Sequence, residues 1–198
     1  MTKNGRYAAK VNVMVKKTPR KKRKPNTLNA IAGTDAIAIL RILADRDNEL
    51  SKEIDSIAHD LLADVTLIGV AGCVQAELAS LAVEDVWDRS GARRDGYVDP
   101  GDAAMQIFEV ALEPFREDML KHLQLSMLEQ AQAIWLGILR GIYDFHLHSN
   151  TEFKDWAVDV PGEVFETYLA EWKEQFQEST STSKLKQFLS AHCPNWAE

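Results

Sequence analysis

The stretch SMLEQAQAIWLGILRGIYDF, residues 126–145, decides the fold class of this chain. Its first four residues fit the S-x-x-E capping box, in which the Ser126 hydroxyl and the Glu129 carboxylate bond to backbone amides at the start of a helix. Apolar side chains then follow at nearly every angle around the helix axis. A helix that is apolar nearly all round belongs inside a protein, so we expect this one to be central.

Outward from this helix, apolar residues recur at helical spacing, and no segment alternates like a strand. Thr34 is expected to cap the first helix and Asp99 the fifth, whereas Pro114 predicts a kink or break near Leu112. The chain is therefore predicted to be all-α, with seven or eight helices in antiparallel pairs, forming an irregular bundle or a short solenoid-like array. The expected helices span about 34–47, 49–63, 66–81, 84–89, 99–123, 126–145, 159–176 and 185–189.

Two features of the helical body concern its packing. Trp87 is expected to insert into the core. Gly69, Ala71 and Gly72 form a narrow side of the third helix and would let another helix approach closely, although each glycine costs up to about 1 kcal/mol of helix propensity.

Composition excludes two classes of protein. Two cysteines, Cys73 and Cys193, exclude a disulfide framework, and Cys73 lies in an apolar stretch where we expect a reduced, buried thiol. The longest uncharged segment after residue 35, residues 65–76, is shorter than the roughly 20 residues that span a bilayer. The apolar patch at residues 11–15 is too short for a signal-peptide core. We therefore expect a cytoplasmic protein with no membrane segment.

Charge is divided unevenly along the chain. The first 34 residues hold ten of the 23 basic residues and no acid, so residues 35–198 hold 13 basic and all 30 acidic residues, a net charge of −17. Charge repulsion, two prolines and few large apolar groups predict that residues 1–30 are a disordered basic arm. Residues 31–198 are expected to form a single α-helical domain.

The arm contains the strongest candidate for nucleic-acid contact. Its cluster of cations would bind phosphate backbones through counterion release, without discriminating between sequences, and its single aromatic residue argues against stacking on bases. A solubilising tail, a tail docked on the acidic body, a nuclear-import signal and an organelle transit peptide are alternatives. The candidate residues are Lys16, Lys17, Arg20, Lys21, Lys22, Arg23 and Lys24.

The loop at residues 88–99 is the most site-like stretch of the body, because it concentrates three arginines and three aspartates around two glycines. Arg89, Arg93 and Arg94 are candidates for binding an anion or another ligand, since a guanidinium group holds phosphate or carboxylate with two parallel hydrogen bonds. An ion-paired connection between two helices is the alternative.

No metal site or cofactor is predicted. His146 and His148 are two positions apart and point to different faces of a helix, whereas a facing pair of metal ligands needs i, i+4 spacing. Residues 98–102 (VDPGD) and 158–163 (VDVPGE) are similar to each other, and both precede a helix. Shared capping chemistry explains this similarity as well as duplication does.

Three short segments carry a family resemblance: LAVEDVWDRSG at residues 81–91, GYVDP at 96–100 and LEPF at 112–115. Together they resemble a family of prokaryotic all-helical proteins that has no assigned activity. The GYVD start is also similar to helical regions that accompany SWIM zinc fingers. The resemblance covers about residues 35–175 and implies an all-helical body. It implies no zinc finger, catalytic residue or activity for this chain.

No nucleophile elbow, P-loop or local Cys/His signature is present in the sequence. We therefore expect a non-enzymatic helical protein-interaction module, whose partner is another protein or a second copy of the chain. A nucleic-acid-associated accessory protein, binding phosphate through residues 16–24, is the alternative. An enzyme is the third hypothesis, and its first candidate residues would be Asp88, Arg93, Arg94, Asp95 and Asp99.

Overall fold

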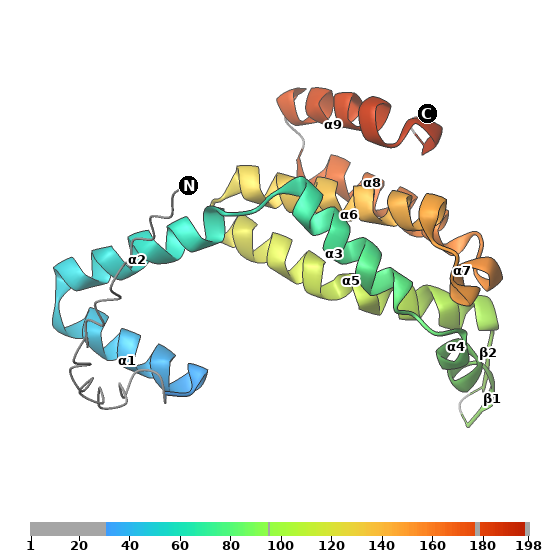
Figure 1. The fold of residues 1–198 in the computed structure, drawn as a ribbon, viewed down its shortest axis with the longest axis horizontal. Helices are drawn as coiled ribbons and strands as arrows, with labels where there is room; N and C mark the ends of the chain where they lie inside the picture. Colours follow the sequence, from blue (N-terminus) through green and yellow to red (C-terminus); the bar gives the residue numbers. More distant parts are fainter. Residues whose placement is uncertain (1–30, 95, 177–178, 197–198) are drawn as a thin grey trace, which may run out of the picture. The chain divides into compact units, whose positions relative to one another are not determined.

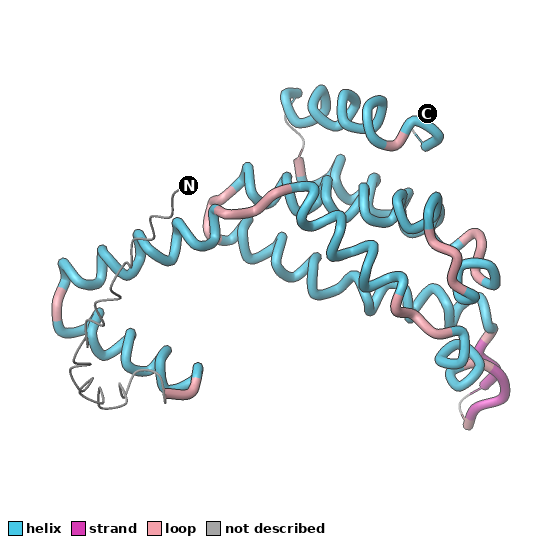
Figure 2. The backbone as a smooth tube through the Cα atoms, viewed as in Figure 1, coloured by secondary structure: helices cyan, strands magenta, loops and turns pink. Residues whose placement is uncertain are grey.

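The computed structural model of this 198-residue chain describes residues 31–94, 96–176 and 179–196. The chain divides into two compact units, residues 1–54 and 55–198, and each is considered by itself. In the described residues, nine α-helices are joined by loops, one two-stranded hairpin and a short 3-10 turn (Figures 1 and 2). The predicted all-α class is confirmed. The predicted arm lies outside the described residues.

The first unit holds helix α1, Gly33–Arg46, and the start of α2, Asn48–Ala63, which continues into the second unit. Ala32, not the predicted Thr34, occupies the N-cap position of α1, since a backbone hydrogen bond of the first turn already ends on the Ala32 carbonyl oxygen. Asp47 opens α2: its Oδ1 accepts hydrogen bonds from two of the following backbone N–H groups, at 2.9 and 3.4 Å.

The second unit contains the other helices and the hairpin. Helix α6 lies at its centre, as predicted, because α3, α5 and α8 all pack against it (Figure 1). One short helix, α7, is additional to those that the sequence predicts. The bounds are Leu67–Ala79 for α3, Val83–Arg89 for α4, Pro100–Gln124 for α5, Leu128–His148 for α6, Glu152–Trp156 for α7, Val160–Gln175 for α8, Ser179–His192 for α9 and Pro194–Trp196 for the 3-10 turn.

Helices α3 and α6 lie close together, and two glycines of α6 allow this approach. A Cβ atom added at Gly137 would lie 2.6 Å from the Cβ of Val70, and one at Gly141 would lie 2.5 Å from the Cβ of Val74. Successive glycines of α6 thus meet successive valines of α3 in the same order, so these two helices run parallel. The intervening α4, hairpin and α5 return the chain to the end of the bundle where α3 began.

The small residues of α3 contribute less to this interface than the sequence predicts. Ala71 is buried in it, but Gly72 is exposed and a Cβ there would meet nothing within 4 Å. Gly69 is also exposed and faces only the Thr66 side chain that caps its own helix. The prediction was wrong for these two glycines, because the core packs against the valine face of α3.

The turn between α5 and α6 differs from the predicted capping box. Ser126 has φ of 59°, and it follows the C-cap Leu125 of α5. The backbone N–H of Ser126 donates to the Leu123 oxygen, and that of Met127 donates to the His122 oxygen, both at 2.9 Å. These are the two bonds of a Schellman motif. Ser126 therefore ends α5, and α6 begins after Met127 without a side-chain cap.

Helix α5 continues through Pro114, so the break that the sequence offered as one alternative near Leu112 does not occur. Proline removes one backbone hydrogen bond and leaves the carbonyl oxygen four residues earlier, on Val110, without its usual donor. Pro114 and Val110 both lie on the exposed face of α5, where water would bond to that oxygen. The predicted start at Asp99 is confirmed, since Asp99 Oδ1 accepts a hydrogen bond from Gly101 N at 2.7 Å.

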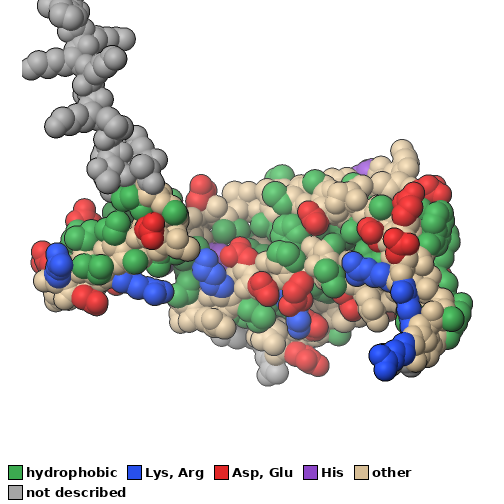
Figure 3. Space-filling view, turned by 90° about the horizontal axis from the view of Figure 1, so that it is seen from below, with side chains coloured by type: hydrophobic (Ala, Val, Ile, Leu, Met, Phe, Trp, Pro, Cys, Tyr) green, Lys and Arg blue, Asp and Glu red, His purple; other side chains and the backbone are tan. Residues whose placement is uncertain are grey.

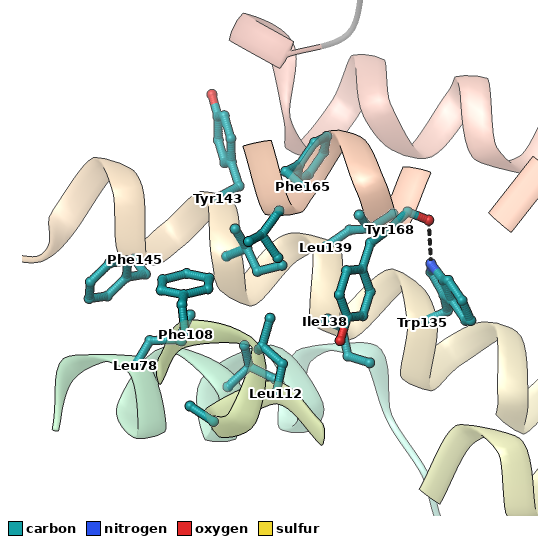
Figure 4. Packing of buried hydrophobic residues seen from close by; sticks show 14 of the residues in the cluster. Leu78, Phe108, Leu112, Trp135, Ile138, Leu139, Tyr143, Phe145, Phe165 and Tyr168 are labelled. Atoms are coloured by element: carbon teal, nitrogen blue, oxygen red, sulfur yellow. Dashed lines mark hydrogen bonds between the residues drawn. The ribbon is translucent and has the colours of Figure 1, made fainter. Parts of the chain in front are cut away.

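The core of the second unit is a cluster of aromatic and aliphatic side chains around α6 (Figure 4). Trp135 donates its Nε1 hydrogen to the Tyr168 carbonyl oxygen of α8 at 3.1 Å. Trp87 was predicted to lie in this core but is 53% exposed, because Val83 and Val86 fill the inner face of the short helix α4. The labelled core residues are Leu78, Phe108, Leu112, Trp135, Ile138, Leu139, Tyr143, Phe145, Phe165 and Tyr168.

Polar contacts fix the outer helices of the second unit. His122, which is buried, places Nδ1 2.7 Å from the Asp118 carbonyl oxygen and Nε2 3.1 Å from the Leu62 carbonyl oxygen, so it ties α5 to the end of α2. The Gln132 amide of α6 donates to the Ser181 hydroxyl and accepts from Lys184 Nζ, both at 2.9 Å. Buried amide bonds of this kind hold α9 in register with α6.

Candidate interaction surfaces

Helix α1 buries none of its residues, although it carries five large aliphatic side chains. Each of the five is at least 36% exposed. Figure 3 shows hydrophobic side chains, in green, at the surface over this helix. Large aliphatic residues gathered on one surface helix are typical of a site that another protein covers. The five residues are Ile37, Ile39, Leu40, Ile42 and Leu43.

A second group of exposed aliphatic residues lies in the second unit, on the end of α2 and the start of α3. Ile57 and Leu61 of α2 are 54% and 75% exposed, and Ile68 of α3 is 82% exposed. Ile57 and Leu61 recur at helical spacing in α2, as residues of an apolar face do, but α2 buries none of its residues. Periodicity identifies the apolar face of a helix, and it does not say which molecule covers that face.

The predicted anion loop forms a β-hairpin. Strand β1, Gly91–Arg93, pairs antiparallel with β2, Gly96–Val98, and Arg93 lies opposite Gly96. Strands of three residues are too short for an alternating pattern to reveal them, so the sequence predicted a loop. Gly91 and Gly96 have φ of 89° and 137°, a conformation that favours glycine.

All three candidate arginines are exposed. Arg93 and Arg94 are exposed on the hairpin, and Arg89 is exposed at the end of α4 beside a shallow cavity that Glu109 and Glu113 also line. Among the described residues, these guanidinium groups form no ion pair within 4 Å. Their exposure leaves them available to an anionic partner, and their role in binding an anion stays a prediction.

The histidines near the end of α6 separate as their spacing predicts. His146 is half-buried and packs against the Trp196 ring with centroids 4.7 Å apart, whereas His148 is exposed. Burial, with the nearby Lys154 cation as a second cause, lowers the pKa of His146. Among the described residues, no three His, Cys, Asp or Glu side chains are grouped as metal ligands.

The two cysteines have opposite environments. Cys73 is exposed on α3, contrary to the predicted buried thiol, because it lies on the side of α3 that faces away from α6. Cys193 is buried after the end of α9, and burial raises the pKa of its thiol to about 12. Cys193 is therefore an unreactive thiol, whereas the exposed Cys73 is open to thiol reagents.

Residues of the two similar segments, 98–102 and 158–163, line one cavity of about 360 Å³. It lies between the starts of α5 and α8 and also touches Trp156. Carboxylates at helix N-termini are favoured by the helix dipole, and this explains them without a ligand. No Lys, Arg, His, Ser or Cys side chain is among the residues that line this cavity. Its acidic lining residues are Asp99, Asp102, Asp159 and Glu163.

Comparison with protein-family models, curated proteins and solved structures finds no match to this chain. The resemblance drawn from residues 81–115 stays a prediction. In the described residues, no single helix is long and apolar enough to cross a membrane; only α2 and α3 taken together, with the bend between them, reach that length and composition. The basic residues of segment 16–24 lie outside the described residues.

Proposed function

We propose that this chain is a cytoplasmic helical protein-interaction module rather than an enzyme. The observation that carries the proposal is the exposure of large aliphatic side chains on α1 and α2, two helices that bury no residue. Full burial of a fully exposed side chain of this kind contributes about 1.5–3 kcal/mol, so covering one that is about half exposed contributes roughly half of that. A partner that covers several of them would therefore gain enough free energy to offset the cost of association.

Charge around these residues favours a selective partner. The polar positions of α2 include Glu49, Glu53, Asp55 and Asp60 and only one basic residue, Lys52. Acidic residues on the same helix as the exposed Ile57 and Leu61 would attract basic proteins to this surface and repel other acidic ones. The core of the second unit would serve as the rigid scaffold that holds Ile57 and Leu61 at the end of α2.

Site-directed photo-crosslinking tests this function. A photoreactive residue at Leu61 or Ile68 of the full chain is expected to crosslink one defined protein in cells, whereas one at the exposed Glu152 of α7 is not. Excess purified wild-type chain should compete for the crosslink, and a chain with Leu61→Asp should not. Crosslinking that is equal at all three positions, or absent from all, would contradict the proposal.

Nucleic-acid binding through residues 16–24 is the second candidate function. The observation that favours it is the placement of ten cations and no acid in the first 34 residues. The seven cations of segment 16–24 would give a log–log dependence of duplex affinity on salt with a slope of about −6. Fluorescence anisotropy with duplex DNA measures this slope.

Two variants of the full chain separate the arm from the hairpin in that measurement. Deleting residues 1–26 is expected to abolish binding. Replacing Arg89, Arg93 and Arg94 by glutamine leaves the arm intact and should reduce affinity less than fivefold, since each phosphate contact adds a small uniform increment. Binding that survives the deletion, or that does not depend on salt, would rule out this function.

A further inference from the structure

We infer that a cavity between α8 and the 3-10 turn Pro194–Trp196 binds an organic ammonium group, either of a small amine or of a lysine side chain. The cavity has a volume of about 210 Å³. None of the residues that line it belongs to α1, α2 or α3, so the inference goes beyond the proposed interaction function and does not depend on it. The lining residues are Gly162, Phe165, Glu166, Leu169, Asn195 and Trp196.

Aromatic rings form the apolar part of the lining. Phe165 of α8 and Tyr143 of α6 (Figure 4) each pack against the Trp196 ring, with centroids 4.7 and 5.2 Å from it. Phe165 is buried and Trp196 is half-buried, so part of the indole ring stays accessible from the cavity. A cation is attracted to the face of an aromatic ring, and most strongly to that of tryptophan. The rings therefore favour an organic cation.

Two polar side chains line the same cavity and are free to bind a ligand. Glu166 of α8 and Asn195 are both exposed, and neither side chain has a hydrogen bond or ion pair with another residue in the part of the chain that the structure describes. The carboxylate attracts a positive charge, and both side chains offer oxygen atoms that accept hydrogen bonds from an N–H group. A phosphate or carboxylate ligand is disfavoured, because it would meet the Glu166 carboxylate.

The basic side chains beside this ring cluster are engaged elsewhere and leave the charge of Glu166 open. Arg140 forms an ion pair with Asp144 at 2.8 Å. Lys154 Nζ donates a hydrogen bond to a backbone oxygen, also at 2.8 Å. Burial, with the Lys154 cation as a second cause, lowers the pKa of His146, so the imidazole that packs against Trp196 stays neutral near pH 7.

Backbone hydrogen bonds hold the turn that carries Asn195 and Trp196. The Trp196 N–H donates to the Cys193 carbonyl oxygen at 2.9 Å, and the Cys193 N–H donates to the Leu189 carbonyl oxygen at 2.8 Å. The Cys193 side chain is buried, which anchors the turn to the core. A site whose walls are already fixed loses less entropy when a ligand binds, so this lining is preorganised.

The size of the cavity selects one chemical group rather than a whole metabolite. Pockets for drug-sized ligands occupy about 300–1,000 Å³, which exceeds the volume of about 210 Å³ found here. Gly162 lies three, four and seven positions before Phe165, Glu166 and Leu169, so it shares their face of α8. A Cβ atom at Gly162 would meet nothing within 4 Å, so a larger side chain there can fill the cavity without moving the fold.

Titration of the purified full chain with two ammonium probes, choline and a lysine blocked at both backbone ends, tests the site. Heteronuclear NMR spectra should show a saturable shift of the Trp196 indole signal, which Trp196→Phe identifies, with a Kd on the order of 1 mM. Tighter binding of choline assigns the site to a small quaternary amine. Equal or tighter binding of the blocked lysine assigns it to the side chain of a protein partner.

A neutral analogue of choline, in which a tert-butyl group replaces the trimethylammonium group, tests whether charge is recognised. It should bind at least about tenfold more weakly than the tighter ammonium probe, because a ring face and a carboxylate attract only the charged group. An indole signal that neither ammonium probe shifts overturns the inference, and so does a neutral analogue that binds as tightly as the tighter probe.

Three variants of α8 locate the site. Glu166→Gln keeps the size of the side chain and removes its charge, so it should weaken binding of the tighter ammonium probe by about tenfold. Glu174→Gln is the matched control: Glu174 is also exposed on α8 but does not line the cavity, so the Kd should change by less than about twofold. Gly162→Leu fills the cavity and should abolish binding. Wild-type affinity in Glu166→Gln or Gly162→Leu overturns the inference, as does an equal loss in the two glutamine variants.

Discussion

Helices α6 and α1 both carry large aliphatic residues on more than one face, but α6 buries twelve of its 21 residues and α1 buries none. Helix α6 has neighbours on several sides, including α3 and α5, and Gly137 and Gly141 bring α3 close to it. In the first unit, no other helix covers α1 enough to bury any residue. The contrast shows that aliphatic side chains make a helix suitable for burial. Burial within the chain also requires neighbouring helices that cover those side chains.

The contrast assigns α6 a role in the stability of the fold and α1 a role in association. Residues of α6 stabilise the fold from within, so their replacement should lower the free energy of unfolding. Residues of α1 are available to a partner, so their replacement should change association and leave the stability of the second unit nearly unchanged. The following experiments test the distinction, beginning with the largest expected effect.

Truncating one isoleucine in each helix compares the two regions directly. Ile138→Ala in α6 should lower the free energy of unfolding by about 2–5 kcal/mol, because Ile138 is fully buried and its truncation leaves a cavity. Ile42→Ala in α1 should change it by less than about 0.5 kcal/mol, because Ile42 is 49% exposed. Urea unfolding followed by tryptophan fluorescence measures both. Equal losses would show that α1 belongs to the folded core.

Glycine replacements test the close approach of α3 and α6. Gly141→Ala should destabilise the protein by about 1–3 kcal/mol, because the new Cβ would lie 2.5 Å from the Cβ of Val74 and force the helices apart. Gly72→Ala is the matched control: it is also a helix interior position, and its Cβ would meet nothing within 4 Å. It should stabilise α3 by up to about 1 kcal/mol. A stabilising Gly141→Ala would contradict the packing described here.

The smallest expected effect is the pH dependence that Cys193 contributes. Burial raises the pKa of this thiol from 9.0 to about 12, so the unfolded chain releases the proton at lower pH than the folded one. The resulting stability is complete below about pH 9 and is lost as pH rises toward 12, reaching a loss of about 1 kcal/mol at pH 10. Cys193→Ala should reduce the slope of stability against pH in this range.

The rate of thiol modification also distinguishes the exposed cysteine from the buried one. In the native protein a thiol reagent should modify one cysteine per chain, Cys73, and should reach Cys193 only after denaturation. Modification of both cysteines at the same rate under native conditions would show that the end of α9 opens readily.

Local patterns of the sequence predict most of the helical fold. The central position of α6 follows from its apolar residues, and the start of α5 follows from Asp99 and Pro100, because caps and periodicity depend on neighbours within one or two turns. The end of α5 was predicted to within one residue, but the role of Ser126 was not, since a serine at this place fits the start of a helix as well as the end of one. The backbone bonds from Ser126 and Met127 complete the end of α5.

The candidate sites were harder to predict. Arg89, Arg93 and Arg94 lie close together in sequence, but the structure leaves all three exposed, with two of them on a hairpin that the sequence did not predict. Trp87 and Cys73 have apolar neighbours in sequence, and both are exposed because another face of their helix packs inward. The inward face depends on the neighbouring helices, which a single segment does not specify.

The sequence by itself determined the helical class, the central helix and the division of charge between residues 1–34 and the rest, because these follow from composition and from contacts along one helix. Only the tertiary structure decided which glycines allow close packing, which cysteine is buried and which aliphatic residues stay exposed. Those outcomes depend on side chains far apart in sequence that meet in space. Helix α1 is the clearest case, since its residues predict burial and its surroundings in the first unit do not provide it.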